Sequence, residues 1–420
     1  MNDAPRDRDG DTVPAPSVRS EVGRLRTVLL HRPGEELRRV TPATMGELLF
    51  DELLWVEEAQ REHDAFAQVL RDAGVEVLLV SDLLAEALTD DGVAADVVDR
   101  HVTPATCGPA LVDRVRGLVR DDDPATLARH LVSGVTLEEV ASADGGRLDG
   151  LVAASSSDDG AVLHPLPNLV FTRDASAWVG GGVVLSPMRH PVRHRETDLL
   201  RTVVRHHPRF AGSPVWFGDG PHDHHPATLE GGDLLVVADR ALAIGRSERT
   251  SAAGIEQLAT RLFAADAIDR ILVVDLPEVR AAMHLDTVVT QVDVDAFLTY
   301  PQMTGSVRCF RLTPGPGGGV HVADADGLEP GLAWATGRDD VRAIAPDLGS
   351  ARAAREQWND ANNTLALRPG EVIAYARNEA TNEVLDAAGI TVHTIPSAEL
   401  PRGRGGPRCM SCPVVRDPVR

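Results

Sequence analysis

Lysine is absent from this 420-residue sequence, so all 42 of its basic residues are arginine. Enzymes that form a Schiff base, attach pyridoxal phosphate or hold nucleotide phosphates with a P-loop need a lysine, and the sequence excludes these chemistries. Positive charge is also scarce relative to negative charge, because 63 acidic residues give a formal net charge of −21. Nucleic acid and an acidic membrane surface would both be repelled, so we expect neither as a partner.

Cysteine and long apolar runs are scarce as well. Four cysteines (Cys107, Cys309, Cys409 and Cys412) are too few for a disulfide framework in a chain of this length, which indicates a reducing compartment. No apolar run reaches the roughly 18 residues of a membrane-spanning helix. Residues 1–20 are rich in Asp, Arg and Pro and lack an apolar centre, which predicts a disordered tail and not a signal peptide. We therefore expect a cytoplasmic protein.

Hydrophobic residues make up 43% of the chain, enough for a large core, and their spacing predicts alternating strands and helices. Residues 26–31 and 75–80 are predicted strands, and residues 56–73 are a predicted amphipathic helix. Residues 81–146 differ, because apolar side chains recur there at helical spacing without strand signals. This segment predicts a helical insertion.

From residue 165 onward a strand–turn–strand unit recurs with variation. The polar positions that precede its first strand are 168–174, 230–233, 284–286 and 362–364. Three of the copies are followed by a helical segment, clearest at residues 252–263, and the N-terminal strands supply a fifth unit. A unit that cannot bury its own face must pack on its neighbours, so residues 21–420 predict an α/β fold of the propeller type.

Polar side chains gather where the first strands of the three central units begin. They are Asn168 and Asp174, Glu230 and Asp233, and His284 and Asp286. If equivalent strand starts point at a common axis, these acids and bases converge there, as in an active site. Because His284 and Asp286 lie at i and i+2, both would share one face of a strand. Simpler interpretations stay open: a cross-strand polar pair, a turn with two solvated acids, and an ion pair of Asp174 with Arg173.

A loop near the C-terminus carries the candidate nucleophile. Residues 401–413 contain three Gly, three Pro and three Arg, which excludes a helix or a central strand and places Cys409 on an irregular loop. Fixed positive charge and exposed N–H groups favour a thiolate, so we expect a lowered pKa for Cys409 and a nucleophilic sulfur. An inert thiol in a surface loop is the alternative interpretation.

Two other motifs have the residue types of metal or redox sites. The histidines at 222, 224 and 225 lie in a proline-flanked loop and lack the i, i+4 spacing of a helical zinc site, so we assign no metal. Cys409 and Cys412 form a C-x-x-C pair, but no thioredoxin-like strand and helix surround it.

Taken together, seven motifs resemble a known family. They are residues 167–174, 193 with 195–197, 229–233, 247–251, 283–286, 356–360 and 403–409. In this order, from about residue 20 to the C-terminus, they are similar to the arginine deiminase family of guanidine-modifying enzymes. The resemblance implies a five-bladed αβ propeller, the pentein fold, with residues 81–146 as a helical insertion in its first blade.

The resemblance also implies a role for single residues. Cys409 would attack the guanidinium carbon of free L-arginine while Asp174 and Asp286 grip the guanidinium nitrogens. His284 would protonate the leaving ammonia and then activate the water that releases citrulline, with Glu230 orienting its ring. The residues implied around the substrate are Asn168, Phe171, Arg193, Asp233, Arg249 and Arg404.

Further expectations follow from the same resemblance. We expect no cofactor and a homo-oligomer. Cys412 stands where we expect methionine in this family, which predicts a reversible disulfide with Cys409 under peroxide. The alternatives are a deiminase or amidinotransferase acting on another guanidine, such as agmatine or a methylated arginine, and an inactive propeller that serves as a binding protein. The complete set of five ionisable groups argues against an inactive protein.

Overall fold

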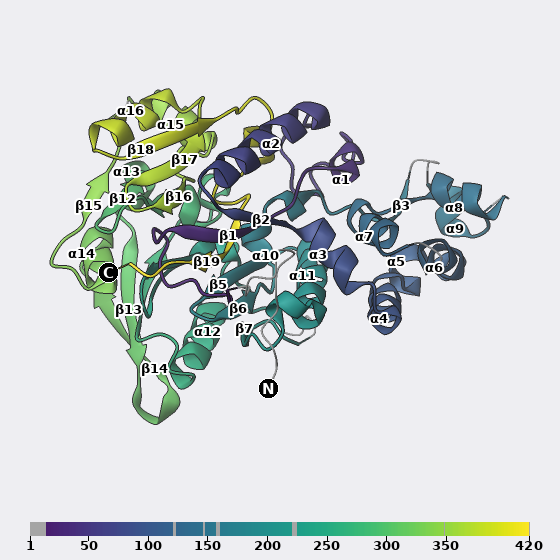
Figure 1. The fold of residues 1–420 in the computed structure, drawn as a ribbon, viewed down its shortest axis with the longest axis horizontal. Helices are drawn as coiled ribbons and strands as arrows, with labels where there is room; N and C mark the ends of the chain where they lie inside the picture. Colours follow the sequence, from purple (N-terminus) through teal and green to yellow (C-terminus); the bar gives the residue numbers. More distant parts are fainter. Residues whose placement is uncertain are drawn as a thin grey trace.

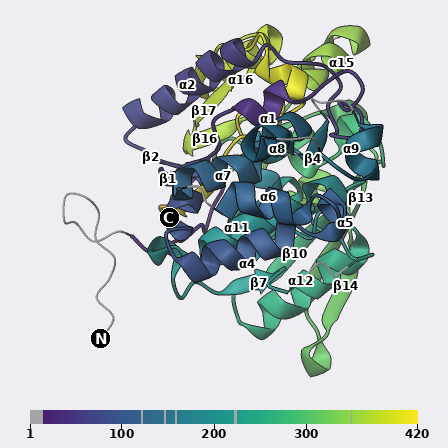
Figure 2. The same cartoon turned by 90° about the vertical axis from the view of Figure 1, so that its right-hand side faces the viewer.

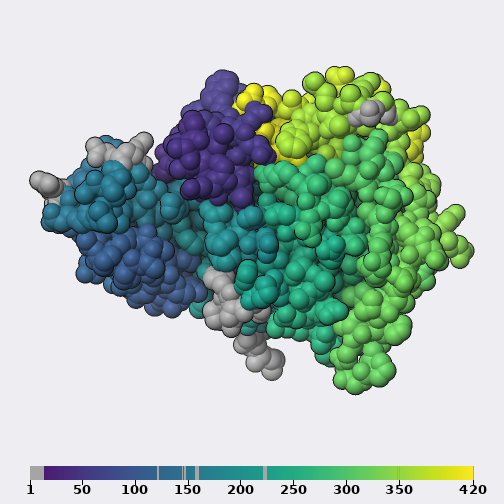
Figure 3. Space-filling model, turned by 180° about the vertical axis from the view of Figure 1, so that it is seen from behind, coloured from purple at the N-terminus to yellow at the C-terminus, as the bar shows by residue number. Residues whose placement is uncertain are grey.

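The computed structural model describes residues 14–120, 123–145, 148–156, 160–220, 225–347 and 349–419. These residues form a mixed α/β fold in which small sheets make up the body and a lobe of helices stands to one side (Figures 1 and 3). Within these ranges, every helix is too short or too polar to cross a membrane.

Five sheets in the described part of the chain share one topology. In each, a first strand pairs antiparallel with a second, which pairs parallel with a third. The sheets are β19-β1-β2 (Cys412–Arg416, Leu25–Leu30, Glu76–Leu79), β5-β6-β7 (Ser176–Val179, Gly182–Leu185, Val215–Phe217), β8-β9-β10 (Leu234–Ala238, Ala241–Arg246, Arg270–Asp275), β11-β12-β15 (Val289–Gln291, Ala296–Thr299, Arg342–Ile344) and β16-β17-β18 (Leu365–Arg368, Glu371–Tyr375, Thr391–Ile395). The first of them joins the two ends of the chain, because β19 pairs with β1.

Additional strands extend or accompany these sheets. The hairpin of β13 (Arg308–Pro314) and β14 (Val320–Ala325) continues the third sheet beside β10, and it projects from the body in Figure 1. A small pair, β3 (Val135–Thr136) and β4 (Ala161–Leu163), lies apart from them.

A parallel pair of strands needs a crossover, and in all five sheets this crossover contains a helix. The helices are α2 (Val56–Asp72), α11 (His194–His206), α12 (Ala252–Ala264), α14 (Leu328–Thr336) and α16 (Glu379–Ala387). In α2, Ala59, Phe66 and Leu70 are buried at helical spacing, which is why this stretch folds as a helix on one side of the core. The helices predicted at 56–73 and 252–263, and both N-terminal strands, are confirmed to within one residue.

Helices also fill most of residues 80–155 and form the lobe that faces the viewer in Figure 2. They are α3 (Val80–Ala87), α4 (Asp91–His101), α5 (Pro104–Cys107), α6 (Val112–Arg120), α7 (Pro124–Ser133), α8 (Leu137–Asp144) and α9 (Leu151–Ser155). Outside the lobe, the remaining described helices are α1 (Glu35–Arg38), α10 (Thr172–Ala175), α13 (Pro301–Thr304) and α15 (Ser350–Trp358). The apolar sides of the lobe share one hydrophobic core with the β5-β6-β7 sheet. Because α9 lies beyond residue 146, the predicted boundary of the helical segment is too early.

The predicted N-terminal tail is also too long. Ser17 donates its backbone N–H to Val414, and Val18 exchanges backbone hydrogen bonds with Gly180. Val18 is 2% exposed, so apolar contact with the body fixes this segment well before residue 21. Residues 1–13 of the predicted tail lie outside the described residues.

Candidate active site

Short helical turns precede the first strands of the three central sheets. The turn α10 precedes β5, a 3₁₀ turn at Gly231–Asp233 precedes β8, and another at Leu285–Thr287 precedes β11. His284 and Asp286 therefore do not share one face of a strand, and that prediction is wrong. Asp233 is the physical reason, because its Oδ1 accepts the N–H of Leu285 at 2.7 Å and holds this backbone in a turn.

Cys409 lies where these turns meet. It is 4% exposed, its Sγ is 3.5 Å from Asp286 Oδ2, and its backbone N–H donates to Asn363 Oδ1 at 2.9 Å. Burial, Asp286, Asp174 and Asp360 raise the pKa of the Cys409 thiol well above its ordinary value. The expected lowering of this pKa is therefore wrong for the free protein.

The three arginines of the Cys409 loop are engaged elsewhere. Arg402 forms an ion pair with Glu52 at 3.1 Å, and the Arg404 guanidinium stacks 3.5 Å from the ring centre of Trp358. Arg408 donates to Glu21 at 3.1 Å and to Asp286 at 2.7 Å. Arg402 and Arg408 are thus paired with acids, whereas Arg404 is stacked on a neutral ring. Burial and the nearby acids outweigh the lowering effect of Arg408 on the pKa of the Cys409 thiol.

His284 lies between two carboxylates. Its Nε2 is 2.8 Å from Glu230 Oε2, and its Nδ1 is 3.6 Å from Asp174 Oδ1. Burial alone would lower the pKa of His284, but Asp174 and Glu230 outweigh burial and Asp233 adds to them, so the pKa rises from 6.5 to about 9. The imidazole is therefore protonated at neutral pH and can donate a proton.

Glu230 is fully buried and ionised. Burial would raise its pKa, but Arg249 at 3.5 Å, the hydrogen bond to His284 and Arg193 at 3.9 Å together hold the pKa of this carboxyl below its usual range. The glycines beside it allow close approach, since a Cβ on Gly232 would lie 2.6 Å from His284 Nδ1.

Asp174 and Asp286 each give one oxygen to an arginine and leave the other without a hydrogen bond from the described residues, although Asp174 Oδ1 lies 3.6 Å from His284 Nδ1. Asp174 Oδ2 accepts from Arg193 and Asp286 Oδ2 accepts from Arg408, both at 2.7 Å. The Oδ1 atom of each is buried and has no hydrogen-bond partner in the described part of the chain. Two unsatisfied carboxylate oxygens beside a thiol form a site for a flat cation with N–H donors.

The other residues predicted to contact the substrate differ in how many of their polar atoms are already hydrogen-bonded within the protein. Arg193 is bonded to Asp174, Glu196 and the Asn168 carbonyl, and Asp233 accepts from Ser247 as well as Leu285. Burial raises the pKa of Asp233 to about 7. Both Asp233 oxygens are already bonded, so the geometry favours bracing of the turn over the substrate contact implied by the resemblance.

Asn168 and Phe171 are both buried, and Phe171 lies against the Cys409 loop. Asn168 donates its side-chain amide to the Leu48 carbonyl at 2.7 Å. Phe171 packs on the Cys409 loop so closely that a Cβ on Gly405 would lie 2.2 Å from its ring. A glycine is therefore required where the loop crosses this ring.

The donor atoms of Asp174, Glu230 and His284 lie within 4.8 Å of one another, close enough to hold a metal ion. The guanidinium groups of Arg193 and Arg249 contact the same carboxylates, which disfavours a second cation there. This geometry suits proton transfer better than metal binding. The histidines at 222 and 224 lie outside the described residues.

Sequence reasoning missed four residues of the site. They are Glu21, Asp360, Asn363 and Arg408, which all lie within or beside the quoted motifs except Glu21. Asn363 donates to the Asp286 carbonyl at 3.1 Å as well as accepting from Cys409. The largely polar stretch at residues 359–363, directly after α15, was a signal that could have identified Asp360 and Asn363 as site residues. No local pattern in the sequence distinguishes Glu21.

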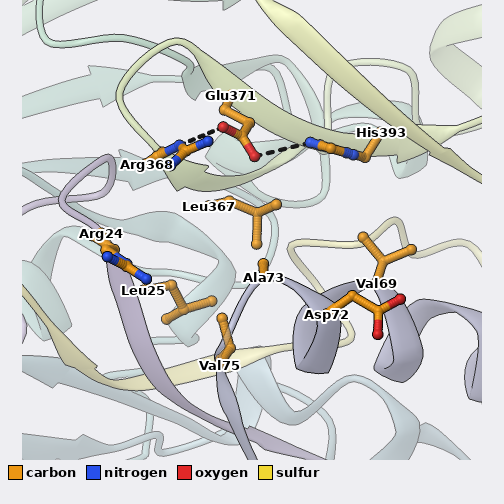
Figure 4. Close-up of a pocket in the computed structure, with 10 residues that line it drawn as sticks. All are labelled: Arg24, Leu25, Val69, Asp72, Ala73, Val75, Leu367, Arg368, Glu371 and His393. Carbon is orange, nitrogen blue, oxygen red and sulfur yellow. Dashed lines mark hydrogen bonds and ion pairs between the residues drawn. The ribbon is translucent and has the colours of Figure 1, made fainter.

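Two cavities differ in their relation to this site. One of 390 Å³ lies between α2, β1 and the β16-β17-β18 sheet, where Glu371 bonds Arg368 and His393, and it contains none of the predicted site residues (Figure 4). Another of 310 Å³ is lined by Arg404, Trp358 and Glu52, next to the Cys409 loop.

Likeness to solved structures supports the fold. The N-terminal domain of ArgZ, an arginine dihydrolase from the ornithine–ammonia cycle in cyanobacteria, gives a TM-score of 0.53 at 16% identity over 93% of this chain and 97% of that chain. Unliganded AgrE gives 0.53 at 18% identity over 94% of this chain, which spans only 40% of the AgrE chain. A dimethylarginine dimethylaminohydrolase gives 0.50 at 16% identity, over 92% and 99%. At these identities the likeness concerns the fold alone.

Comparison with related sequences shows the family as well as the fold. The family model of arginine deiminase matches residues 46–416. The arginine deiminase of Rhodococcus opacus (strain B4) is 45% identical over 95% of this chain and 97% of its own length, and that of Rhodococcus erythropolis (strain PR4 / NBRC 100887) is 45% identical over 96% and 98%. With a matching family model over most of its length and relatives at this identity, the chain belongs to the arginine deiminase family.

Proposed function

We propose that this protein hydrolyses free L-arginine to L-citrulline and ammonia through a covalent intermediate on Cys409. One observation carries the proposal. The buried thiol lies beside two carboxylates, Asp174 and Asp286, and each has one buried oxygen that accepts no hydrogen bond from the described residues. A guanidinium is planar and cationic, so it can satisfy both oxygens and place its central carbon near the sulfur.

Substrate binding also supplies the thiolate. In the free protein, burial and carboxylate charge keep the Cys409 thiol protonated at neutral pH. A guanidinium between Asp174 and Asp286 cancels that charge and adds a cation beside the sulfur, which favours loss of the proton. Deprotonation is therefore coupled to the arrival of a cationic substrate, and the empty site is protected from other electrophiles.

In the first half of the reaction, the Cys409 thiol releases its proton to solvent, the sulfur adds to the guanidinium carbon and a C–S bond forms. Protonated His284 donates a proton to one terminal nitrogen, the C–N bond breaks, and ammonia leaves. Glu230, at 2.8 Å from Nε2, holds the ring and balances its charge. His284 is then neutral.

In the second half, neutral His284 accepts a proton from water, and the hydroxide oxygen adds to the same carbon. The C–S bond breaks, the new C–OH group gives its proton to the leaving sulfur, and citrulline leaves with the Cys409 thiol and protonated His284 both restored. Cationic arginine and one water thus give citrulline, ammonia and the one proton that the thiol released, with no change of oxidation state.

The remaining predicted residues serve the substrate either directly or by supporting the acids. Arg404 is the best placed to bind the carboxylate, because its Nε and Nη2 are buried and have no hydrogen-bond partner among the described residues. Arg193 and Arg249 are bonded to acids and act by holding Asp174 and Glu230 in place. Asn168 and Phe171 bound the approach to the sulfur.

We also propose that the five sheets close into a five-bladed propeller around this site, with the helical lobe as an insertion in the first blade. The pairing of β19 with β1 supports closure, because it joins the last strand of the chain to the first. A homo-oligomer in the cytoplasm remains our expectation from the resemblance.

Assays of citrulline and ammonia from L-arginine, without added metal or cofactor, test the function. Cys409→Ser should lose nearly all turnover while folding normally, because serine is a poor nucleophile and leaving group here. Cys107→Ser and Cys309→Ser are the controls and should stay active. Mass spectrometry of acid-quenched enzyme should find the adduct on the peptide with Cys409; an active Cys409→Ser variant would contradict the mechanism.

A further inference from the structure

Glu21 is a buried carboxylate of the N-terminal segment that no step of the reaction uses. It is 5% exposed. Its Oε1 accepts the backbone N–H of Val236 at 3.2 Å, and its Oε2 accepts the Nε–H of Arg408 at 3.1 Å. A buried ion pair is often no more stabilising than an apolar pair of the same size, so the pairing of Glu21 with Arg408 indicates a role besides stability.

Arg408 connects Glu21 to the active site. This guanidinium is 1% exposed, and it donates Nη1 to Asp286 Oδ2 and Nη2 to the Leu234 carbonyl, both at 2.7 Å. A guanidinium is planar, and its N–H donors point in fixed directions. The bonds of Nε to Glu21 and of Nη2 to Leu234 therefore fix the direction of Nη1, and with it the position of the Asp286 carboxylate.

The Asp286 carboxylate completes the connection to Cys409. Its Oδ2 lies 3.5 Å from Cys409 Sγ, and its Oδ1 is buried and has no hydrogen-bond partner among the described residues. Both oxygens belong to one planar group, so a displacement of Oδ2 also moves Oδ1. Loss of the bond between Glu21 and Arg408 should thus misplace the oxygen assigned above to the guanidinium of the substrate, where small displacements are costly.

Glu21 also balances positive charge next to the site. The ionisable groups that face it are three buried arginines, Arg408, Arg173 and Arg416. Burial would raise the pKa of Glu21, but these arginines lower it from 4.5 to about 2, so Glu21 is ionised at neutral pH. Burial would likewise lower the pKa of Arg408, but Glu21 and Asp286 outweigh burial and raise it. Without the Glu21 carboxylate, one further positive charge next to the site would have no counter-charge.

We propose that Glu21 is a positioning residue of the active site, which acts through Arg408 to orient Asp286 and to balance the arginine charge beside Cys409. This inference rests on the proposed hydrolysis of L-arginine and extends the residues that support it to the N-terminal segment. Glu21 touches neither the sulfur nor the substrate in this role. Its effect on both is carried by Arg408.

Neutralisation of Glu21 should have opposite effects on the thiol and on the substrate. The ionisable groups that face Cys409 are Asp286, Asp174, Asp360, Arg408, Arg404 and Tyr375. Burial and the three acids raise the pKa of the Cys409 thiol, whereas Arg408 lowers it. When Glu21 no longer offsets the charge of Arg408, the pKa of the thiol should fall by about one unit. The same positive charge repels a guanidinium and weakens substrate binding.

The test compares Glu21→Gln, which keeps the shape and removes the charge, with Glu21→Asp, which keeps the charge and shortens the side chain. In Glu21→Gln, alkylation of Cys409 by the neutral reagent iodoacetamide should become about tenfold faster at about pH 8, because the rate follows the thiolate fraction. Mass spectrometry of the peptide that holds Cys409 measures this rate. In the same variant, kcat/KM for L-arginine should fall about 10-fold to 100-fold.

The conservative variant and a control complete the test. Glu21→Asp should keep both the alkylation rate and kcat/KM to within about fivefold of wild type, because it retains the charge. Glu371→Gln, in an ion pair with Arg368 outside the site, is the matched control and should change neither quantity.

The reverse order, with Glu21→Gln close to wild type and Glu21→Asp strongly impaired, would show that Glu21 only fills space and would overturn the proposal. Unchanged alkylation in Glu21→Gln would overturn it as well. If Glu21→Gln does not fold, Glu21→Asp decides, because a loss beyond about fivefold in that variant contradicts a role based on charge. Absence of citrulline with the wild-type protein would contradict the proposed function, whereas the alkylation rates would still test Glu21.

Discussion

Replacement of Glu230 by glutamine should move the pH dependence of turnover. The protonated form of His284 donates to the leaving ammonia, so kcat falls as pH rises through the pKa of His284, about 9 in the native protein. Glu230→Gln keeps the shape of the side chain but removes the charge that lies 2.8 Å from Nε2. The protonated imidazole loses its nearest anionic partner, so the pKa must fall.

The magnitude follows from that contact. A hydrogen bond to a charged group contributes about 1.5–3 kcal/mol. Because about 1.36 kcal/mol corresponds to one pKa unit, the alkaline limb of kcat should move down by about 1–2 units, from about pH 9 to about pH 7–8. Arg193 and Arg249, which face Glu230 in the native protein, would each lose one carboxylate partner, so their charge would lower the pKa of His284 further.

The assay is kcat for citrulline formation at saturating L-arginine across the pH range. Glu371→Gln is the matched control, because Glu371 Oε1 contacts His393 Nε2 at 2.9 Å in a pair outside the site. That variant should keep the native limb. An unmoved limb in Glu230→Gln, or an equal shift in Glu371→Gln, would refute the assignment of the proton donor to His284.

Three other predictions concern geometry, specificity and redox behaviour. Gly232→Ala should lower kcat by about 100-fold or more with the fold retained, because the new Cβ would displace the His284 ring from its alignment. The control Gly220→Ala, whose Cβ would meet no described atom within 4 Å, should be neutral in the same assay and in thermal unfolding. Agmatine lacks the carboxylate that we propose Arg404 binds, so its kcat/KM should be roughly 1,000-fold below that of L-arginine; robust turnover would refute the substrate assignment. After mild peroxide, dithiothreitol should restore wild type better than Cys412→Ala, and equal recovery would exclude a Cys409–Cys412 disulfide.

Local patterns in the sequence predicted much of the secondary structure. Apolar runs of four to six residues gave the strands, and residues 56–73 gave a helix, because periodicity depends on neighbours along the chain. The same logic failed at His284 and Asp286. A strand would place them on one face, but Asp233, about 50 residues away in sequence, binds the Leu285 N–H and imposes a turn.

The chemistry of the site was predicted in part. The residue types at Cys409 and His284 already indicated a nucleophile and a proton carrier, and the family resemblance added Glu230 as the acid that orients the histidine. The structure places Glu230 against His284 and Asp286 against Cys409. The pKa of Cys409 was predicted in the wrong direction. The sequence shows three arginines in the loop but not the distant groups, such as Glu52 and Glu21, that pair with them.

The sequence by itself therefore determined which reactive groups the chain carries and the order in which they occur. The tertiary structure alone decided which of their atoms are free. Asp174 and Asp286 each give one oxygen to an arginine and keep the other, whereas Asp233 uses both. The physical reason is that such pairing depends on contacts between residues far apart in sequence. In a buried site an unpaired charge is costly, so each charge is either paired within the protein or left to bind a ligand.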